Sequence, residues 1–166
     1  MKRLLVRLAL VLLAGLNPTA GAEEARFDVS QIIDKAIAES ILEEPVKAPA
    51  PRNVEGNDGY YSKCNYYTTS GRKRLVLRVY QAAPGYDPKK ELETVAETNG
   101  AMRAISGIGE KARVSSGVAG GLPSQVVMLY VVKGNSLITI GLSGFEDEAV
   151  AIDKVKDVAQ KIVGRL

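Results

Sequence analysis

Apolar positions near the start of the chain follow a helical spacing. Ile32, Ile33, Ala36, Ile37 and Ile41 recur every three or four residues, which is typical of an amphipathic helix. Asp28 precedes this stripe and can cap the first free N–H groups, and Pro45 follows it and disfavours helix at the preceding residue. The pattern predicts one helix over 28–44, followed by a surface connection rich in proline and glycine.

A second pattern, with a period of two, begins at Tyr60. The stretch 60–69 (YYSKCNYYTT) and the stretch 73–82 (KRLVLRVYQA) flank a turn at 70–73 (SGRK). In the second stretch Leu75, Leu77 and Val79 alternate with Arg74, Val76, Arg78 and Tyr80. Alternation of this kind around a turn predicts a β-hairpin with one buried face.

The remaining patterns complete an α+β order. Asp87-Pro88 opens a helix that ends near Asn99-Gly100, and a turn within 104–116 leads into a short strand. A glycine-rich loop over 115–125 precedes two apolar strands, 126–133 and 136–143, which are joined at Gly134-Asn135. An amphipathic helix follows over 147–166. We therefore predict one antiparallel sheet of about five strands with helices on one face, in the order α-β-β-α-β-β-β-α.

The N-terminal segment has the pattern of a secretory signal peptide. Lys2, Arg3 and Arg7 precede a short apolar run, and Ala20-Gly21-Ala22 provides small residues for cleavage. The run is about half the roughly 20 residues needed to span a bilayer. We expect residues 1–22 to be removed, leaving 23–166 as a single α+β domain without a membrane span in a periplasmic or extracellular location.

Removal of this segment changes the charge balance. The formal charge is +3, but three of the 22 Lys and Arg residues and none of the 19 Asp and Glu residues lie in 1–22, so the remaining chain is neutral. A nucleic-acid surface needs clustered positive charge, and none is expected here beyond 72–74 at the predicted turn. The chain has one cysteine, Cys64, so no disulfide can form within it.

Composition also limits the available chemistry. The chain has no histidine, which removes Ser-His-Asp and Cys-His arrangements and the common zinc sites. We expect no enzyme activity, no metal and no cofactor. One alternative is a carboxylate-dependent hydrolase of cell-wall polymer that uses acidic side chains such as Glu110 and Glu55.

The strand over 60–69 is the candidate binding element. Alternation places Tyr61, Lys63, Asn65 and Tyr67 on one face and Cys64 on the other, between Tyr60 and Tyr66. Tyrosine with asparagine suits recognition of sugars or peptides, although tyrosine also favours strands in general. Cys64 is read as a small buried hydrophobe, or else as the site of an intermolecular disulfide.

Two short motifs resemble a group of small extracytoplasmic bacterial domains of unknown function, many of them lipoproteins. They are Cys64-Asn65-Tyr66, in a Cys-x-aromatic strand, and Gly107-Ile108-Gly109-Glu110-Lys111-Ala112, in a turn. The resemblance covers most of the chain after residue 22 and implies an envelope-associated domain with no assigned activity. This chain lacks both the lipid-attachment cysteine and the second cysteine that can pair with the strand cysteine in such domains.

These observations lead to one expectation and two alternatives. We expect an exported, non-enzymatic binding or accessory module of the cell envelope, with an envelope protein or wall component as its partner. The hydrolase is the first alternative. The second is a structural domain that forms homo-oligomers, such as a homodimer bridged at Cys64.

Overall fold

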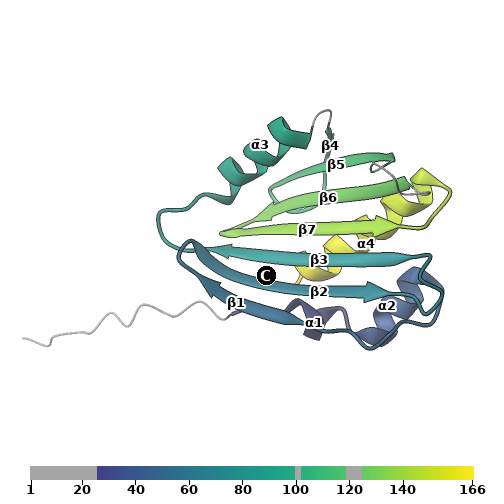
Figure 1. Ribbon diagram of the computed structural model, residues 1–166. Helices are drawn as coiled ribbons and strands as arrows, with labels where there is room; N and C mark the ends of the chain where they lie inside the picture. Colours follow the sequence, from purple (N-terminus) through teal and green to yellow (C-terminus); the bar gives the residue numbers. More distant parts are fainter. Residues whose placement is uncertain (1–25, 100–101, 119–124) are drawn as a thin grey trace, which may run out of the picture.

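The fold is a single antiparallel sheet flanked by helices, seen in a computed structural model that describes residues 26–99, 102–118 and 125–166. Seven strands follow the order β1-β2-β3-β7-β6-β5-β4 (Figure 1). They are β1 (Arg52–Gly56), β2 (Gly59–Tyr67), β3 (Arg74–Ala82), β4 (Arg103–Ile105), β5 (Lys111–Val118), β6 (Gln125–Lys133) and β7 (Ser136–Ser143). The mixed helix-and-strand class and the antiparallel sheet are confirmed.

The predicted strand number and element order were wrong. β1 lies in the proline-rich stretch that was predicted to be a connection, and four of its five residues are exposed, so it has no apolar alternation. β4 has only three residues. β5 extends to Val118, into the stretch predicted to be a loop. The predicted segment 119–124 of that loop lies outside the described residues, as does the predicted signal peptide.

The predicted first helix is divided into α1 (Val29–Ile32) and α2 (Lys35–Leu42). Asp28 caps α1 as predicted, accepting a hydrogen bond from the Ser30 N–H at 2.9 Å. Asp34 caps α2 in the same way, accepting from the Ile37 N–H at 2.8 Å. Between them Ile33 leaves the helical conformation and is completely buried. The second aspartate therefore starts a new helix inside one continuous apolar stripe.

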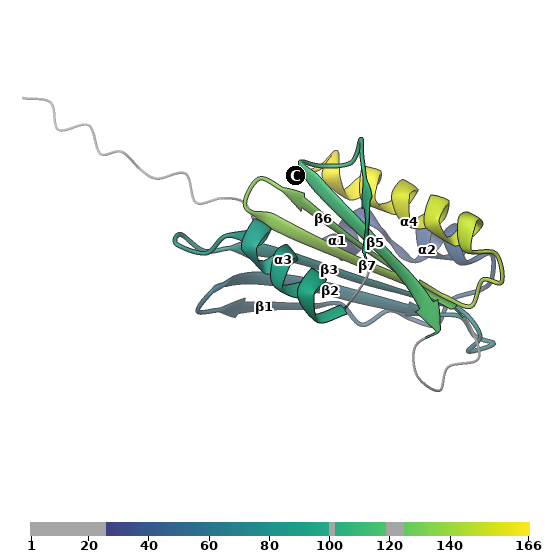
Figure 2. The same ribbon diagram turned by 90° about the horizontal axis from the view of Figure 1, so that it is seen from above.

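The helices cover both faces of the sheet rather than one. α1, α2 and α4 (Glu148–Val163) pack on one face and enclose the main core, whereas α3 (Pro88–Asn99) lies on the opposite face (Figure 2). The buried Leu92 of α3 belongs to a second apolar cluster with Tyr80, Tyr130 and Leu137. The prediction that all helices share one face was wrong for α3, because β3, β6 and β7 carry large apolar side chains on both faces.

The two hairpins that place the candidate residues agree with prediction. β2 pairs with β3 along its whole length, and β6 pairs with β7 across a turn in which Gly134 has φ of 56°. Among the described residues, no helix is both long enough and apolar enough to cross a membrane.

Candidate binding face

β2 separates its side chains cleanly between the core and the opposite face of the sheet. Ser62, Cys64 and Tyr66 are buried against the helices. Lys63 and Asn65 are exposed on the other face, and Tyr67 is exposed over 44% of its surface. The four predicted residues Tyr61, Lys63, Asn65 and Tyr67 therefore lie together on the part of the sheet that α3 leaves uncovered. We call this surface of β1, β2 and β3 the open face.

The inward side of β2 anchors the first helix. The Ser62 hydroxyl accepts a hydrogen bond from the Val29 N–H at 2.9 Å, and the Tyr66 hydroxyl donates to the Ile33 carbonyl oxygen. Burial is the main cause that raises the pKa of the Tyr66 phenol. These buried contacts fix which side of β2 faces the core, and therefore which side faces out.

Tyr61 supports its neighbours and does not present a free ring. It stacks on Tyr80 with 4.8 Å between ring centroids, and its hydroxyl donates to the Asp58 carboxylate. The Arg78 guanidinium carbon lies 4.7 Å from its centroid and Lys63 Nζ lies 5.7 Å from it. Burial, followed by the hydrogen bond to Asp58, raises the pKa of Tyr61 to about 12. The ring is thus a fixed platform beneath two cations.

Tyr67 and Asn65 form the accessible polar part of the open face. Asn65 Nδ2 lies 3.4 Å from the Tyr67 hydroxyl. An exposed tyrosine ring offers an apolar surface with a polar tip, and few of its torsions must be fixed on binding. These two side chains can contact a ligand directly.

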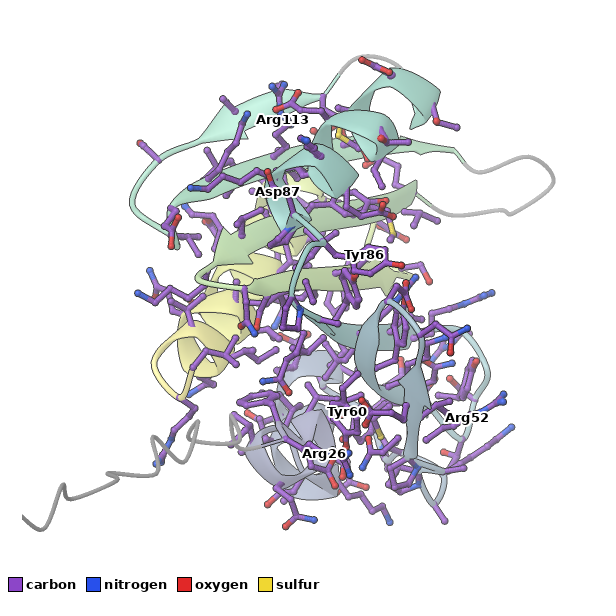
Figure 3. The ribbon with its side chains drawn as sticks, turned by 90° about the vertical axis from the view of Figure 1, so that its left-hand side faces the viewer. Arg26, Arg52, Tyr60, Tyr86, Asp87 and Arg113 are labelled. Carbon is purple, nitrogen blue, oxygen red and sulfur yellow. The ribbon has the colours of Figure 1, made fainter. Side chains whose placement is uncertain are left out.

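Three arginines that the sequence-based prediction missed also lie on the open face. Arg52 lies opposite Lys63 in the β1–β2 pair, Arg78 lies opposite Lys63 in the β2–β3 pair, and Arg74 lies opposite Tyr67. All three are exposed. In the described part of the chain, no carboxylate lies within 4.0 Å of the charged group of Arg52, Lys63, Arg74 or Arg78. Figure 3 shows Arg52 on the side of the sheet away from α1 and α4.

We call Arg52, Lys63 and Arg78 the cation ladder, because they are directly opposite one another on three adjacent strands. Cβ atoms of directly opposed residues are about 4.5–5.5 Å apart, and like charges at such positions are destabilising. The fold places three positive charges where each weakens the sheet. Arginine on β3 was visible in the alternation of 74–80, but Arg52 had no signal because its strand was not predicted.

Cys64 lies in the core and is 1% exposed. Burial is the main cause that raises the pKa of its thiol, so the reactive thiolate is disfavoured. An intermolecular disulfide at Cys64 would first require this part of the sheet to open. The placement agrees with the interpretation of Cys64 as a small buried hydrophobe.

The two carboxylates of the hydrolase alternative lie in or next to strands that are far apart in the sheet order. Glu55 is in β1 and pairs with Arg26 at 2.9 Å. Glu110 directly precedes β5, pairs with Lys89 at 2.9 Å and accepts from the Gly134 N–H at 2.8 Å. The hydrogen bond from Lys89 is the main cause that lowers the pKa of Glu110. Glu110 is thus held ionised and is poorly suited to act as a general acid.

Two hollows lie away from the open face. The larger, about 660 Å³, is formed by α1, the β6–β7 turn and the C-terminus, and its charged lining residues are Arg26, Asp28, Lys133 and Arg165. The second, about 510 Å³, lies beside Phe145, where Lys73 and Lys154 pack on the ring at 4.6 and 5.3 Å. Beside this hollow, Lys73 and Lys154 pair with Glu43, which directly follows α2, so Lys154 of α4 is linked to the end of α2.

The described residues hold no group of three or more cysteine, aspartate or glutamate side chains that could bind a metal ion. Comparison with models of known protein families gives no match, and comparison with curated protein sequences gives none either.

Proposed function

We propose that this chain is an exported, non-enzymatic binding module of the bacterial cell envelope, and that its binding surface is the open face. The observation that carries the proposal is the composition of that face. Tyr67 and Asn65 are exposed beside four cations that have no carboxylate partner among the described residues. The opposite face of β2 and β3 is packed against helices, so of the two faces of these strands it is this one that can meet a partner.

The electrostatic pattern supports recognition over catalysis. The open face presents guanidinium and ammonium groups that attract anions, and the chain has no histidine to act as a general base beside them. Exposed tyrosine, asparagine and arginine are the side chains that binding surfaces favour. The signal-peptide pattern of residues 1–22 supports a partner outside the cytoplasm.

The test is capture of a partner from the native envelope. The full chain, tagged at its C-terminus and exported, is crosslinked mildly and purified, and so is the variant Asn65→Ala/Tyr67→Ala. Both side chains are exposed, so this variant keeps the core intact. The control is Gln160→Ala/Lys161→Ala, which changes two exposed residues of α4 on the other side of the sheet.

We expect a partner that is captured by the wild type and by the control, and that is lost with the open-face variant. A partner retained by the folded Asn65→Ala/Tyr67→Ala protein, or lost only with the α4 control, would contradict the placement of the site.

A further inference from the structure

The cation ladder is the most concentrated unbalanced charge on the described surface of the sheet. Adjacent strands are about 4.8 Å apart, so the backbone positions of Arg52, Lys63 and Arg78 lie within roughly 10 Å of one another. The row of cross-strand pairs continues from Arg78 through Thr139 on β7 and Tyr130 on β6 to Arg113 on β5. There the arginine has a carboxylate partner, because Glu93 lies 3.3 Å from the Arg113 guanidinium and also pairs with Lys111. The ladder has no such partner among the described residues.

Two of the three ladder residues already contact an aromatic ring before any ligand arrives. Lys63 and Arg78 both lie within 6 Å of the Tyr61 ring centre. That ring is fixed in turn by Tyr80 and Asp58. Side chains that are already oriented lose less entropy on binding, so this support favours a ligand that needs several cations at once.

The shape of the surface favours a polymer over a folded protein partner. Protein interfaces concentrate their energy in apolar or aromatic anchors that fill pockets. Neither of the two hollows described above is lined by a ladder residue. A flat cationic surface suits a polyanion, whose affinity comes from many charges and from the counterions they release.

The residue types favour phosphate as the anion. Two of the three ladder residues are arginine, whose planar guanidinium matches the oxygens of a phosphate group in a bidentate pair. Single-stranded nucleic acid would need aromatic faces on which bases stack. Tyr61 is already covered by Tyr80 and Arg78, which leaves Tyr67 as the accessible ring of this strand.

We propose that the open face binds a linear phosphate polymer that runs across β1, β2 and β3 along the cation ladder and passes beside Asn65, the next residue of β2 on that face after Lys63. The ladder residues are binding residues that touch phosphate. This inference rests on the proposed function and names the class of ligand for the same face.

Purified full-length chain tests the inference directly. The probe is long-chain inorganic polyphosphate, with polyglutamate, a thymidine oligonucleotide and vesicles of anionic phospholipid as comparisons. Lys63→Gln and Arg78→Gln should each weaken polyphosphate binding about fivefold, as expected for one cation near a polyanion. The triple variant Arg52→Gln/Lys63→Gln/Arg78→Gln should weaken it more than about fiftyfold, and Lys161→Gln on α4 should leave it unchanged. Thermal unfolding of each variant checks that the fold is kept.

Salt dependence gives an independent readout of the same contacts. For three neutralised phosphates, log affinity should fall against log salt concentration with a slope of about −2 to −3, and each ladder substitution should reduce the steepness by about 0.7 to 0.9. A structural role for the ladder would change stability without changing this slope.

The outcomes separate this inference from the proposed function. Unchanged polyphosphate binding by the folded triple variant, tighter binding of polyglutamate, binding to vesicles alone, or no binding to any probe would each overturn the phosphate-polymer inference. Tighter binding of the oligonucleotide than of polyphosphate would overturn its restriction to a phosphate polymer without bases. Capture of an envelope partner that depends on Asn65 and Tyr67 would still support the binding function in any of these cases. If no envelope partner is captured through Asn65 and Tyr67 either, both the phosphate-polymer inference and the proposed binding function fail.

Discussion

Reversing the central charge of the cation ladder should make the protein more stable, particularly at low salt. Lys63 lies directly opposite Arg52 on one side and Arg78 on the other, and in the described structure it has no carboxylate partner. The substitution Lys63→Glu converts two repulsive cross-strand pairs into two attractive ones. Few surface substitutions are expected to stabilise a protein, so the direction of the effect is itself informative.

The magnitude follows from the spacing of the strands. With roughly 8 Å between charged groups in a medium like water, each pair contributes about 0.5 kcal/mol before screening. Screening reduces this to about 0.2 kcal/mol at 0.15 M salt and about 0.4 kcal/mol at 0.01 M salt. Reversal changes each of the two pairs by twice that amount, which totals about 0.8 and about 1.6 kcal/mol. Loss of the Lys63–Tyr61 cation–π contact offsets about 0.5 kcal/mol.

Urea unfolding at the two salt concentrations measures this prediction. We expect Lys63→Glu to raise the free energy of unfolding by about 1 kcal/mol at 0.01 M salt and by about 0.3 kcal/mol at 0.15 M salt. The melting temperature at low salt should rise by about 3 °C. The control Lys161→Glu makes the same charge change near the end of α4, where a negative charge opposes the helix dipole, and should cost a few tenths of a kcal/mol. A loss of stability in Lys63→Glu at low salt, or an effect independent of salt, would refute the electrostatic reasoning.

Three further predictions test other parts of the fold. In urea unfolding, Gly109→Ala should lower the free energy of unfolding by about 2 kcal/mol or more, because φ at Gly109 is +60° and the new Cβ would lie 2.5 Å from the Val132 carbonyl oxygen. Gly107→Ala, where φ is +83° but the space is open, should lower it by only about 1 kcal/mol. Equal losses would contradict the argument from the close contact. Cys64 should react with a thiol reagent only as fast as the protein opens and should be fully labelled in denaturant, so rapid labelling of the native chain would contradict its burial. The free energy of unfolding should fall as the pH rises above 10, because the Tyr61 phenol of the unfolded chain ionises near 10.0, while that of the folded chain, with its pKa raised to about 12, keeps its proton. Absorbance at 295 nm should show that one tyrosine of the folded chain ionises well above pH 10. Complete ionisation of all tyrosines near pH 10 with the fold intact would refute this.

The sequence predicted elements well where one period dominated. The alternation of 73–82 and the apolar runs of 126–143 correspond to β3, β6 and β7, and Asp87-Pro88 marks the start of α3. The prediction of a single helix over 28–44 was wrong because Asp34 starts a second helix. Asp34 falls at a position where the helical period expects a polar surface residue, so the sequence pattern does not show that it caps a new helix. β1 has no period to read, since its side chains are almost all exposed.

The candidate site was predictable only in part. Alternation placed Tyr61, Lys63, Asn65 and Tyr67 on one face of a strand, but both faces of that strand carry tyrosine, so period alone does not say which face is exposed. Tertiary contacts determine which face is exposed, because the side chains of Ser62 and Tyr66 form hydrogen bonds with the backbone of residues 29–33 and so turn their face of β2 toward the core. The ladder depends on the register between strands, and register with β1 cannot be read from a sequence in which β1 has no signal.

Site-specific photocrosslinking in the native cell tests the central claim most directly. A photoreactive phenylalanine analogue replaces Tyr67, which is 44% exposed on the open face, and in a second strain it replaces Lys161 on α4. We predict an irradiation-dependent adduct in the envelope fraction from position 67 and none from position 161. An adduct from position 161 alone, or none from either position with both proteins folded and exported, would contradict recognition through the open face.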